Sequence, residues 1–197
     1  MTMMTLSLGS VRGACLLLGW CSVAFSLHCK WLQPGQERLS KVILLNFQRL
    51  GDGEMFPTQC MESAFPPDID FIYNTTEVET AVLTLREVTQ RINRFYSNPR
   101  PLLGYNRLRL EHFLAALEQR TNDLRDCIPM NGLNATLHSE ASEAIEGYFR
   151  KLDDIASEKD NSVCARNIIR IEVGRQLRHT ARLTTNIRNI LRTSLFP

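Results

Sequence analysis

The sequence predicts an all-α protein in which one domain is built from five long helices. Three observations support this fold class. Apolar residues recur at helical spacing in five separate segments. Almost none of the chain has the pattern of a strand, and turn-forming proline, glycine and asparagine residues separate the five segments. No internal repeat, low-complexity tract or domain linker interrupts the pattern, so we expect a single domain.

The first residues have the features of a secretory signal peptide. A modest positive start precedes the apolar run Ala14–Phe25, and the small residues Ala24 and Ser26 fit the small-x-small cleavage rule. The run is too short and too weakly flanked to span a bilayer as a stable helix. We therefore expect a signal peptide over residues 1–26, with cleavage two residues later as the alternative, and a secreted, extracellular domain over residues 27–197.

The first helix is expected from about Pro34 to Arg49. Proline suits a first helical turn, because the donor that it lacks would have no partner there. The connection that follows, from Gly51 to about Thr75, contains three prolines. A connection this long without regular structure usually has a function or crosses the molecule. The apolar positions of the first helix are Leu39, Ile43, Phe47 and Leu50.

The second helix is expected to begin at a capping box, Thr76-Glu77-Val78-Glu79. In such a box, the threonine oxygen and the carboxylate of Glu79 each satisfy a backbone donor that has no partner inside the helix. The segment Asn98-Pro99-Arg100-Pro101 ends the helix. Its inward face is expected to carry Val78, Val82, Leu85, Val88, Ile92 and Phe95.

Three further helices are expected in the second half of the chain. One spans about Tyr105 to Asp126, the next begins near Ser139, and the last runs from near Ser162 to about Ser194. At 1.5 Å per residue, the five helices would each be roughly 25 to 45 Å long. Long helices with a long connection are typical of a long-chain cytokine bundle, up-up-down-down with a long first crossover. The inward positions are Leu110, Phe113, Leu117 and Leu124, then Ile145, Phe149, Leu152 and Ile155, then Ile168, Ile171, Leu177, Ile187 and Leu191.

The cysteines of the expected mature chain favour two disulfides. There are four of them, an even number in an oxidising compartment, and none forms the CxxC pattern of a zinc or redox site. The sequence alone leaves their pairing open. Asn74-Thr75-Thr76 and Asn134-Ala135-Thr136 are N-glycosylation acceptors, which agrees with export. The four cysteines are Cys29, Cys60, Cys127 and Cys164.

Composition and motifs give no support for an enzyme or a nucleic-acid-binding protein. The chain has 23 basic and 21 acidic residues, so it lacks the basic excess of a general nucleic-acid binder. It contains no HExxH, GxSxG or GxGxxG motif and no phosphate-binding glycine-rich loop. We therefore expect no catalytic residue, no metal site and no cofactor. The four histidines, none of them four residues from another, are His28, His112, His138 and His179.

Arginines dominate the last helix. The simplest interpretation is a solvated face, since arginine near a helix C-terminus also complements the helix dipole. However, the excess is not confined to the last turn, and it could instead steer a receptor that has acidic binding loops. Arginine is also common among interface hot spots. Against the single acid Glu172, the helix carries Arg166, Arg170, Arg175, Arg178, Arg182, Arg188 and Arg192.

Taken together, the cysteines, helices and crossover resemble the type I interferons of fish, in particular their four-cysteine group. The stretch Cys29-Lys30-Trp31 near the expected mature N-terminus carries part of this resemblance, which covers essentially the whole mature chain. The family often has Cys-Ala-Trp-Glu on its last helix, and only the first two residues match in Cys164-Ala165-Arg166-Asn167. The resemblance implies the disulfides Cys29–Cys127 and Cys60–Cys164. The pairing Cys29–Cys60 with Cys127–Cys164 remains the alternative.

The resemblance also implies a function. Type I interferons bring two different cell-surface receptor chains together and induce antiviral genes without catalysis. One chain would bind the first helix, the crossover and the last helix, where Gly174 lacks the side-chain anchor expected at its position. The other would meet exposed faces of the middle helices, with Gln90, Arg94, Arg107 and Glu111 as candidates. For the first chain, the candidates are Met61, Phe65, Arg170, Arg175 and Arg178.

Two alternative functions are compatible with the sequence. Another helical cytokine would have different receptors but the same physics of binding. A cationic host-defence or lipid-binding helical protein would need a large exposed amphipathic face and loose crosslinking. Here the apolar faces are expected to be buried and two disulfides would hold the bundle closed, so membrane insertion is not expected. Nucleic-acid binding is not expected either, because the charge is balanced.

Overall fold

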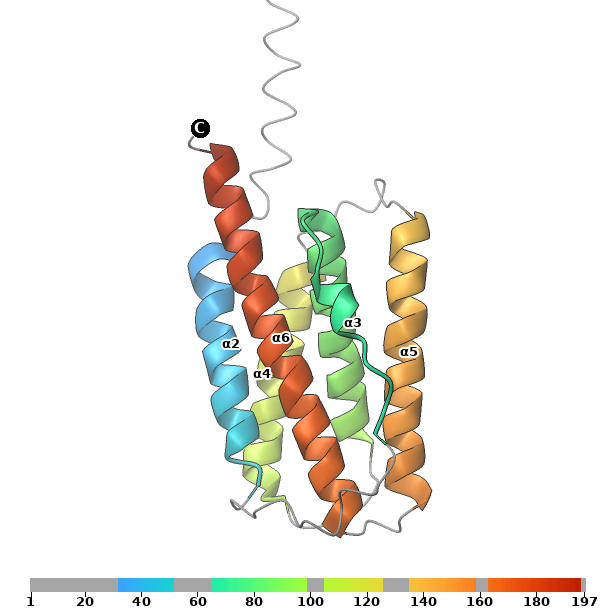
Figure 1. Ribbon diagram of the computed structural model, residues 1–197. Helices are drawn as coiled ribbons and strands as arrows, with labels where there is room; N and C mark the ends of the chain where they lie inside the picture. Colours follow the sequence, from blue (N-terminus) through green and yellow to red (C-terminus); the bar gives the residue numbers. More distant parts are fainter. Residues whose placement is uncertain (1–31, 52–64, 99–104, 126–134, 159–162, 196–197) are drawn as a thin grey trace, which may run out of the picture.

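The computed structural model describes residues 32–51, 65–98, 105–125, 135–158 and 163–195 of the chain. In these ranges every regular element is helical, which confirms the predicted all-α class (Figure 1). The bounds of the long helices lie close to the predicted ones, with one exception: the fourth long helix begins four residues before Ser139. They are α2 (Leu32–Gln48), α3 (Val78–Ser97), α4 (Arg107–Arg125), α5 (Ala135–Glu158) and α6 (Val163–Leu195), with a short 3-10 helix, η2 (Asp70–Tyr73).

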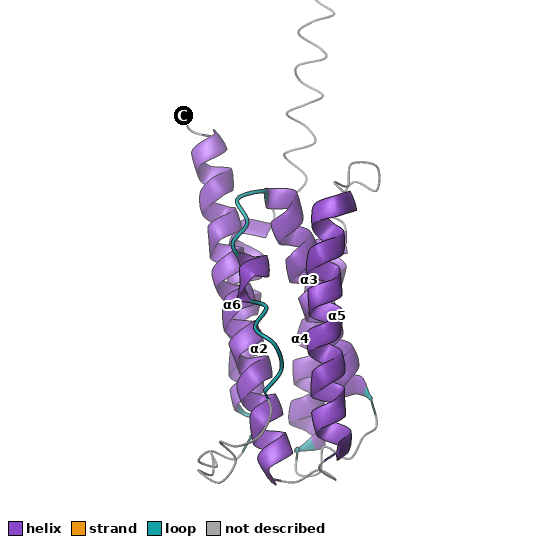
Figure 2. Cartoon of the chain, turned by 45° about the vertical axis from the view of Figure 1, so that its right-hand side comes forward, coloured by secondary structure: helices purple, strands orange, loops and turns teal. Residues whose placement is uncertain are grey.

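Four of the helices, α2, α3, α4 and α6, form the predicted up-up-down-down arrangement, and α5 packs against α3 and α6. In Figure 1, α2 and α3 run downward, α4 and α6 run upward, and α5 runs downward beside α3. Because α2 and α3 are parallel, the chain must return along the bundle between them. Residues 65–77 make part of this return, and Figure 2 shows them climbing past α6 with η2 at mid-height. The long first crossover is therefore confirmed.

Aromatic rings join three helices in the core. The ring centroid of Phe47 on α2 lies 6.2 Å from that of Tyr96 on α3 and 5.4 Å from that of Phe113 on α4. Tyr96 and Phe113 meet edge-to-face at 5.4 Å. Edge-to-face and tilted contacts at this spacing are the favoured geometries of aromatic pairs. The cluster therefore holds α2, α3 and α4 together near one end of α2.

α6 packs against α2, α3 and α5. The prediction that Ile171 points inward is wrong, since this side chain is 41 % exposed. Residues four apart share a helix face, so the buried row that starts at Ile168 continues through Glu172 and Gln176 instead. Ile171 lies about 100° round the helix from Glu172, toward the open side. The buried apolar residues of α6 are Ala165, Ile168, Ile169, Val173, Leu177, Leu183 and Ile187.

The predicted capping box of the second helix is wrong. The N-cap residue is Glu77 rather than Thr76, and its side chain makes no capping hydrogen bond. Instead, the backbone N–H of Glu77 donates to Oγ1 of Thr75 at 3.2 Å, and the hydroxyl of Thr80 donates to the Glu77 carboxylate at 3.0 Å. Helix α3 thus begins one residue later than predicted, so Glu79 is not at the position from which it could close a box.

The end of the crossover contains regular structure that the sequence did not predict. Ile69, Ile72 and Tyr73 are buried, and η2 contacts both α3 and α6. These apolar side chains fasten the connection to the bundle, which explains why this part of it forms a helical turn. Among the described residues, no helix has both the length and the hydropathy needed to cross a bilayer.

Candidate functional site

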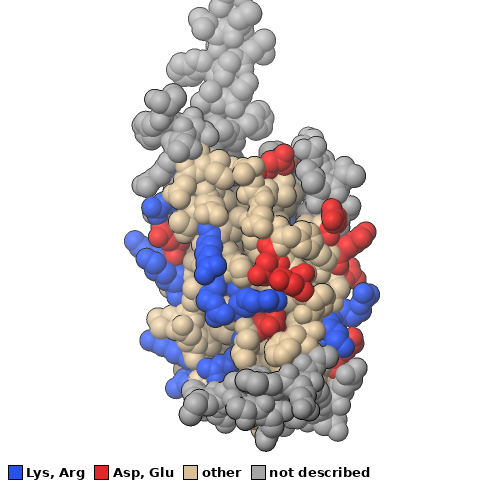
Figure 3. All heavy atoms as spheres, in the orientation of Figure 1, with Lys and Arg blue, Asp and Glu red and all other residues tan. Residues whose placement is uncertain are grey.

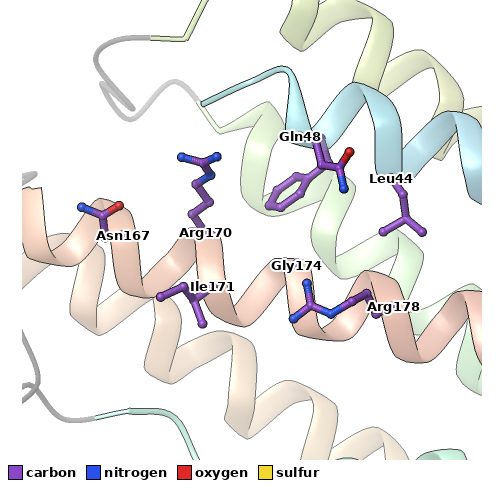
Figure 4. A pocket seen from close by; sticks show the side chains of 8 residues that line it. Leu44, Gln48, Asn167, Arg170, Ile171, Gly174 and Arg178 are labelled. Carbon is purple, nitrogen blue, oxygen red and sulfur yellow. The ribbon is translucent and has the colours of Figure 1, made fainter. Parts of the chain in front are cut away.

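A surface hollow of about 450 Å³ lies between α2 and α6. Leu44 and Gln48 of α2 face Gly174 and the two flanking arginines of α6 across it (Figure 4). We call this hollow and its rim the α2–α6 face. The floor is apolar and the rim is basic, which is a suitable lining for a partner that is itself both apolar and acidic. The lining residues are Leu44, Phe47, Gln48, Asn167, Arg170, Ile171, Gly174 and Arg178.

Gly174 makes the hollow possible. A Cβ atom at this position would lie 3.2 Å from Cε1 of Phe47 and 3.4 Å from a guanidinium nitrogen of Arg178. Glycine inside a helix costs about 0.5–1 kcal/mol relative to alanine. Here that cost coincides with a close approach of the Phe47 ring to the α6 backbone. The anchor that the family resemblance led us to expect at this position is therefore replaced by a cavity.

The two arginines on the rim behave differently. Arg170 is half-buried and lies over the end of α2, where a Cβ atom on Gly51 would collide with its guanidinium. Its charge also reaches the aromatic residues below: burial raises the pKa of Tyr105, and Arg170 opposes that rise. Arg178 is exposed and has no ion pair with a described residue. Arg178 is therefore the arginine of this face whose charge is available to a partner.

Arg175 lies on a different side of α6, away from the hollow. One of its guanidinium nitrogens is 2.9 Å from Oε2 of Glu172, and its side chain is 28 % exposed. Partial burial is the largest single influence on the pKa of Arg175 and lowers it, but the charge of Glu172, with smaller contributions from Tyr148 and Asp70, more than offsets it, so the pKa is raised overall. The structure therefore separates Arg175 from Arg170 and Arg178, which the sequence analysis had grouped together.

Glu172 belongs to a polar cluster beneath the crossover. Tyr148 of α5 donates its hydroxyl to Oε2 of Glu172 at 2.9 Å, and Tyr73 of η2 donates to Oε1 of Gln176 at 2.5 Å. Burial raises the pKa of Tyr148, and the Glu172 charge raises it further. This cluster was not among the features predicted from the sequence. Helical spacing gave one signal, since Glu172 and Gln176 follow the buried Ile168 at intervals of four.

A second contact fastens the crossover to α6. The ring of His179 stacks on Tyr73 at a centroid distance of 5.0 Å, and its Nε2 lies 3.4 Å from Oδ2 of Asp70. Together with the Tyr73–Gln176 hydrogen bond, this contact holds η2 against α6 at successive turns. The crossover is thus positioned by α6, the same helix that supplies the rim of the hollow.

The other predicted site residues have mixed outcomes. Phe65 is 45 % exposed and Asn74 is exposed. Cys164 is disulfide-bonded. Arg107 and Glu111 form an exposed ion pair at 3.0 Å. Gln90 is half-buried and Arg94 is exposed. The remaining predicted residues lie outside the described residues: Cys29, Cys60, Met61, Cys127 and Asn134.

Charge is unevenly distributed over the molecule. On the face drawn in Figure 3, lysine and arginine side chains lie mainly over α2 and α6, and acidic side chains lie mainly toward α5. Within the described ranges, no group of three histidine, cysteine, aspartate or glutamate side chains could hold a metal ion. The α2–α6 face is therefore a basic surface with an apolar hollow, which suits the binding of another protein.

The fold resembles solved interferon structures. Zebrafish interferon 1 superposes with a TM-score of 0.65 at 21% identity, covering 81% of this chain and 100% of that chain. Zebrafish interferon 2 superposes with a TM-score of 0.62 at 17% identity, covering 74% of this chain and 97% of that chain. The predicted likeness to fish interferons is thus confirmed, whereas membership of the four-cysteine group stays a prediction.

Sequence comparison identifies the family. Interferon alpha-A of Bos taurus is 27% identical over 181 residues, which cover 88% of this chain and 93% of the relative. Interferon alpha-17 of Homo sapiens is 27% identical over 189 residues, which cover 93% and 96%. The family model of the interferon alpha/beta domain matches residues 32–187. The chain therefore belongs to the type I interferon family, whose members are non-enzymatic helical cytokines with cytokine receptor chains as partners.

Proposed function

We propose that this chain is a secreted type I interferon that brings two different receptor chains together at the cell surface and thereby induces antiviral genes. The α2–α6 face would bind one of them. The observation that carries this assignment is the hollow at Gly174, which combines an apolar floor with the exposed Arg178 and the exposed Ile171. Interface hot spots are enriched in arginine and aromatic residues and lie in well-packed pockets that exclude water.

Binding at this face would use both shape and charge. A receptor loop with one apolar side chain would fill the hollow and contact Phe47 and Leu44. Acidic residues on the same loop would pair with Arg178, and attraction between opposite charges would speed their encounter. Phe65 and Met61, both from the crossover, and Arg170 would extend the contact. Arg175 would act indirectly, because it is bound to Glu172.

The second receptor chain would bind the side formed by α3 and α5. Arg94 and Arg150 line a smaller hollow of about 240 Å³ there, together with Glu146 and Asp153. The mixed charges of this hollow differ from the basic rim of the α2–α6 face, which supports two different partners. Once one receptor is bound, confinement to the membrane surface raises the effective concentration of the other.

Secretion and crosslinking complete the proposal. Residues 1–26 would direct export, and Asn74 and Asn134 would carry glycans. The end of α2 and the beginning of α6 lie at the same end of the bundle, and the beginning of α2 lies at the same end as the end of α4 (Figure 1). This arrangement supports the pairs Cys60–Cys164 and Cys29–Cys127. Each bond would close a loop of about 100 residues and could contribute roughly 4–5 kcal/mol.

The test uses the purified, oxidised protein on cells of the matching species. We expect antiviral gene induction at picomolar to nanomolar concentration, and an Arg178→Ala variant should need a several-fold higher concentration. Arg125→Ala, at an exposed position on α4, is the matched control and should behave as the parent protein. A folded, disulfide-bonded sample that induces no antiviral genes, or that releases dye from anionic vesicles at low micromolar concentration, would overturn the proposal.

A further inference from the structure

We propose that Phe71 is the platform on which the first sugar of an N-linked glycan at Asn74 packs. The carbohydrate would then be part of the crossover's structure rather than a free appendage. This inference rests on the proposed passage through the secretory pathway, where N-glycans are added. It assigns a role to an aromatic side chain that lies outside both hollows proposed for receptor binding and outside the buried core.

Phe71 is exposed in η2, whose other apolar side chains are buried. Its side chain is 53 % exposed, whereas Ile72 is 5 % and Tyr73 is 8 % exposed. A single exposed apolar residue is common in proteins and needs no explanation by itself. Phe71 stands out because of its position relative to the glycosylation acceptor, three residues before Asn74.

The backbone brings Phe71 and Asn74 to the same side. The N–H of Asn74 donates to the carbonyl oxygen of Phe71 at 3.1 Å, which closes the last turn of η2. A 3-10 helix has three residues per turn, so positions three apart lie one above the other. Asn74 caps this turn and is exposed. A sugar attached to its side-chain nitrogen would therefore start beside the Phe71 ring.

A hollow is present at this place. It measures about 310 Å³ and is lined by Phe71 and Asn74, by the threonines of the acceptor motif, and by Glu77 and Glu140 at the beginnings of α3 and α5. A pyranose ring has C–H groups on its faces and hydroxyl groups around its edge. The negative face of an aromatic ring attracts such C–H groups, and hydroxyl and carboxylate oxygens suit the edge. The lining thus offers both kinds of contact to one sugar.

Covering Phe71 would stabilise the crossover at the point where it joins α6. Tyr73 follows two residues later and carries the hydrogen bond to Gln176 and the stack on His179. A sugar that packs on Phe71 would oppose unwinding of η2 and so keep Tyr73 in place. The glycan would thereby act on stability without contacting the α2–α6 face.

The test is a glycan-dependent stability comparison on protein secreted from eukaryotic cells. All variants carry Asn134→Gln, so that Asn74 is the remaining acceptor site. Mass spectrometry of the Asn74 peptide gives its occupancy. We expect the occupied protein to melt about 2–4 °C above its Asn74→Gln counterpart, a shift typical of one modest contact in a domain of this size. Thr76→Ala, which abolishes the acceptor and keeps Asn74, should give the same loss.

The aromatic ring is tested by crossing these variants with Phe71→Ala. In that background the occupied and unoccupied proteins should melt at the same temperature. Phe65→Ala is the matched control, because Phe65 is similarly exposed on the same crossover, and there the glycan-dependent difference in melting temperature should persist. Trimming the glycan to its first sugar with an endoglycosidase should retain the stabilisation, since that sugar makes the contact.

Three results would overturn the inference: an unoccupied Asn74, an equal glycan effect with and without Phe71, or loss of the effect after trimming to one sugar. Amide hydrogen exchange at Asn74 and Ile72 adds a local reading, and we expect slower exchange in the occupied protein only when Phe71 is present. None of these measurements involves a receptor. A protein that shows the Phe71-dependent effect but induces no antiviral genes would contradict the proposed function and leave the role of Phe71 supported.

Discussion

Gly174 of α6 lies directly against Phe47 of α2. A Cβ atom on the glycine would be 3.2 Å from Cε1 of the ring, which is tighter than ordinary van der Waals contact. The ring has little freedom to give way, because it also contacts Tyr96 and Phe113. This pair determines how closely α2 and α6 approach and leaves the hollow beside them open.

A larger residue at position 174 should therefore destabilise the protein. We expect Gly174→Leu to lower the free energy of unfolding by about 1–3 kcal/mol, the usual cost of overpacking. Gly147→Ala on α5 is the control, since its new Cβ would meet nothing within 4 Å, and it should stabilise by about 0.4–1 kcal/mol. Urea denaturation of both variants checks this, and equal effects of the two substitutions would contradict the close approach.

The polar cluster under the crossover should contribute to stability. Tyr148→Phe removes the hydroxyl that donates to the buried Glu172 carboxylate, and we expect a loss of about 1.5–3 kcal/mol, typical of a hydrogen bond to a charged group. Glu118→Ala, at an exposed position on α4, should change stability by less than about 0.5 kcal/mol. Thermal and urea denaturation measure the stability of both variants. A Tyr148→Phe variant as stable as the parent protein would show that Arg175 alone stabilises the buried charge of Glu172.

The tyrosines should resist ionisation until the protein unfolds. The chain has four tyrosines, and burial is the first cause that raises the pKa of each: Tyr73, Tyr96, Tyr105 and Tyr148. A pKa that is higher in the folded protein means that the folded state holds more protons above the ordinary value of 10.0. Their contribution to stability is complete below that pH and is lost as the pH rises above it.

Alkaline titration checks this expectation. Tyrosinate absorbance should rise together with loss of helical circular dichroism, in one transition above about pH 10. The denatured protein in urea is the control and should titrate near the ordinary value. Reversible ionisation close to the ordinary pKa with unchanged helical signal would contradict the burial of these side chains.

Arg178 and Arg175 should affect activity for different reasons. Arg178→Ala removes an exposed charge on the α2–α6 face, so we expect weaker receptor activation at unchanged melting temperature, with a larger effect at low salt. Arg175→Ala removes the partner of Glu172, so we expect a lower melting temperature together with reduced activity. Dose–response curves and melting temperatures measured on both variants distinguish these effects. If the two variants lost activity and melting temperature to the same extent, the different roles of Arg178 and Arg175 would be contradicted.

Arg120 provides a test of a buried charge. It is 1 % exposed on α4, donates to the hydroxyl of Ser40 and the carbonyl of Gln36 on α2, and burial lowers its pKa to about 10. Arg120→Ala would leave a cavity and should cost about 2–5 kcal/mol. Arg120→Met should cost clearly less, because an apolar side chain of similar length can replace a buried charge. A lower free energy of unfolding for Arg120→Met than for Arg120→Ala, measured by urea denaturation, would contradict this.

The helices and most of the core could be predicted from the sequence, because helical spacing depends only on local residues. The same reasoning failed at Ile171. Ile171 lies three residues after the buried Ile168, whereas the buried row takes a step of four residues and continues at Glu172. It failed again at Thr76, because neighbouring threonines and glutamates allow two registers for the start of α3. Local patterns do not distinguish these registers; contact with the rest of the bundle does.

The candidate site was harder to predict. The arginines of α6 were visible, but separating Arg175 from Arg178 requires knowing which side of the helix is buried. The hydrogen bond between Tyr73 and Gln176 joins residues 103 positions apart, so no local pattern could reveal it. The hollow at Gly174 likewise arises from two helices far apart in the sequence. The missing side chain is evident in the sequence, whereas the cavity that it creates is not.

The position of α6 has a consequence for how the protein is made. It follows α2, η2, α3 and α5 in the chain, yet it contacts all four of them. The earlier helices therefore enter the folding compartment with apolar faces that have no permanent cover, and such faces attract chaperones or aggregate. The bundle can close only after α6 has been synthesised. A chain that terminates before α6 should consequently aggregate or be degraded, and the yield of folded protein should depend on how fast α6 packs onto the other helices.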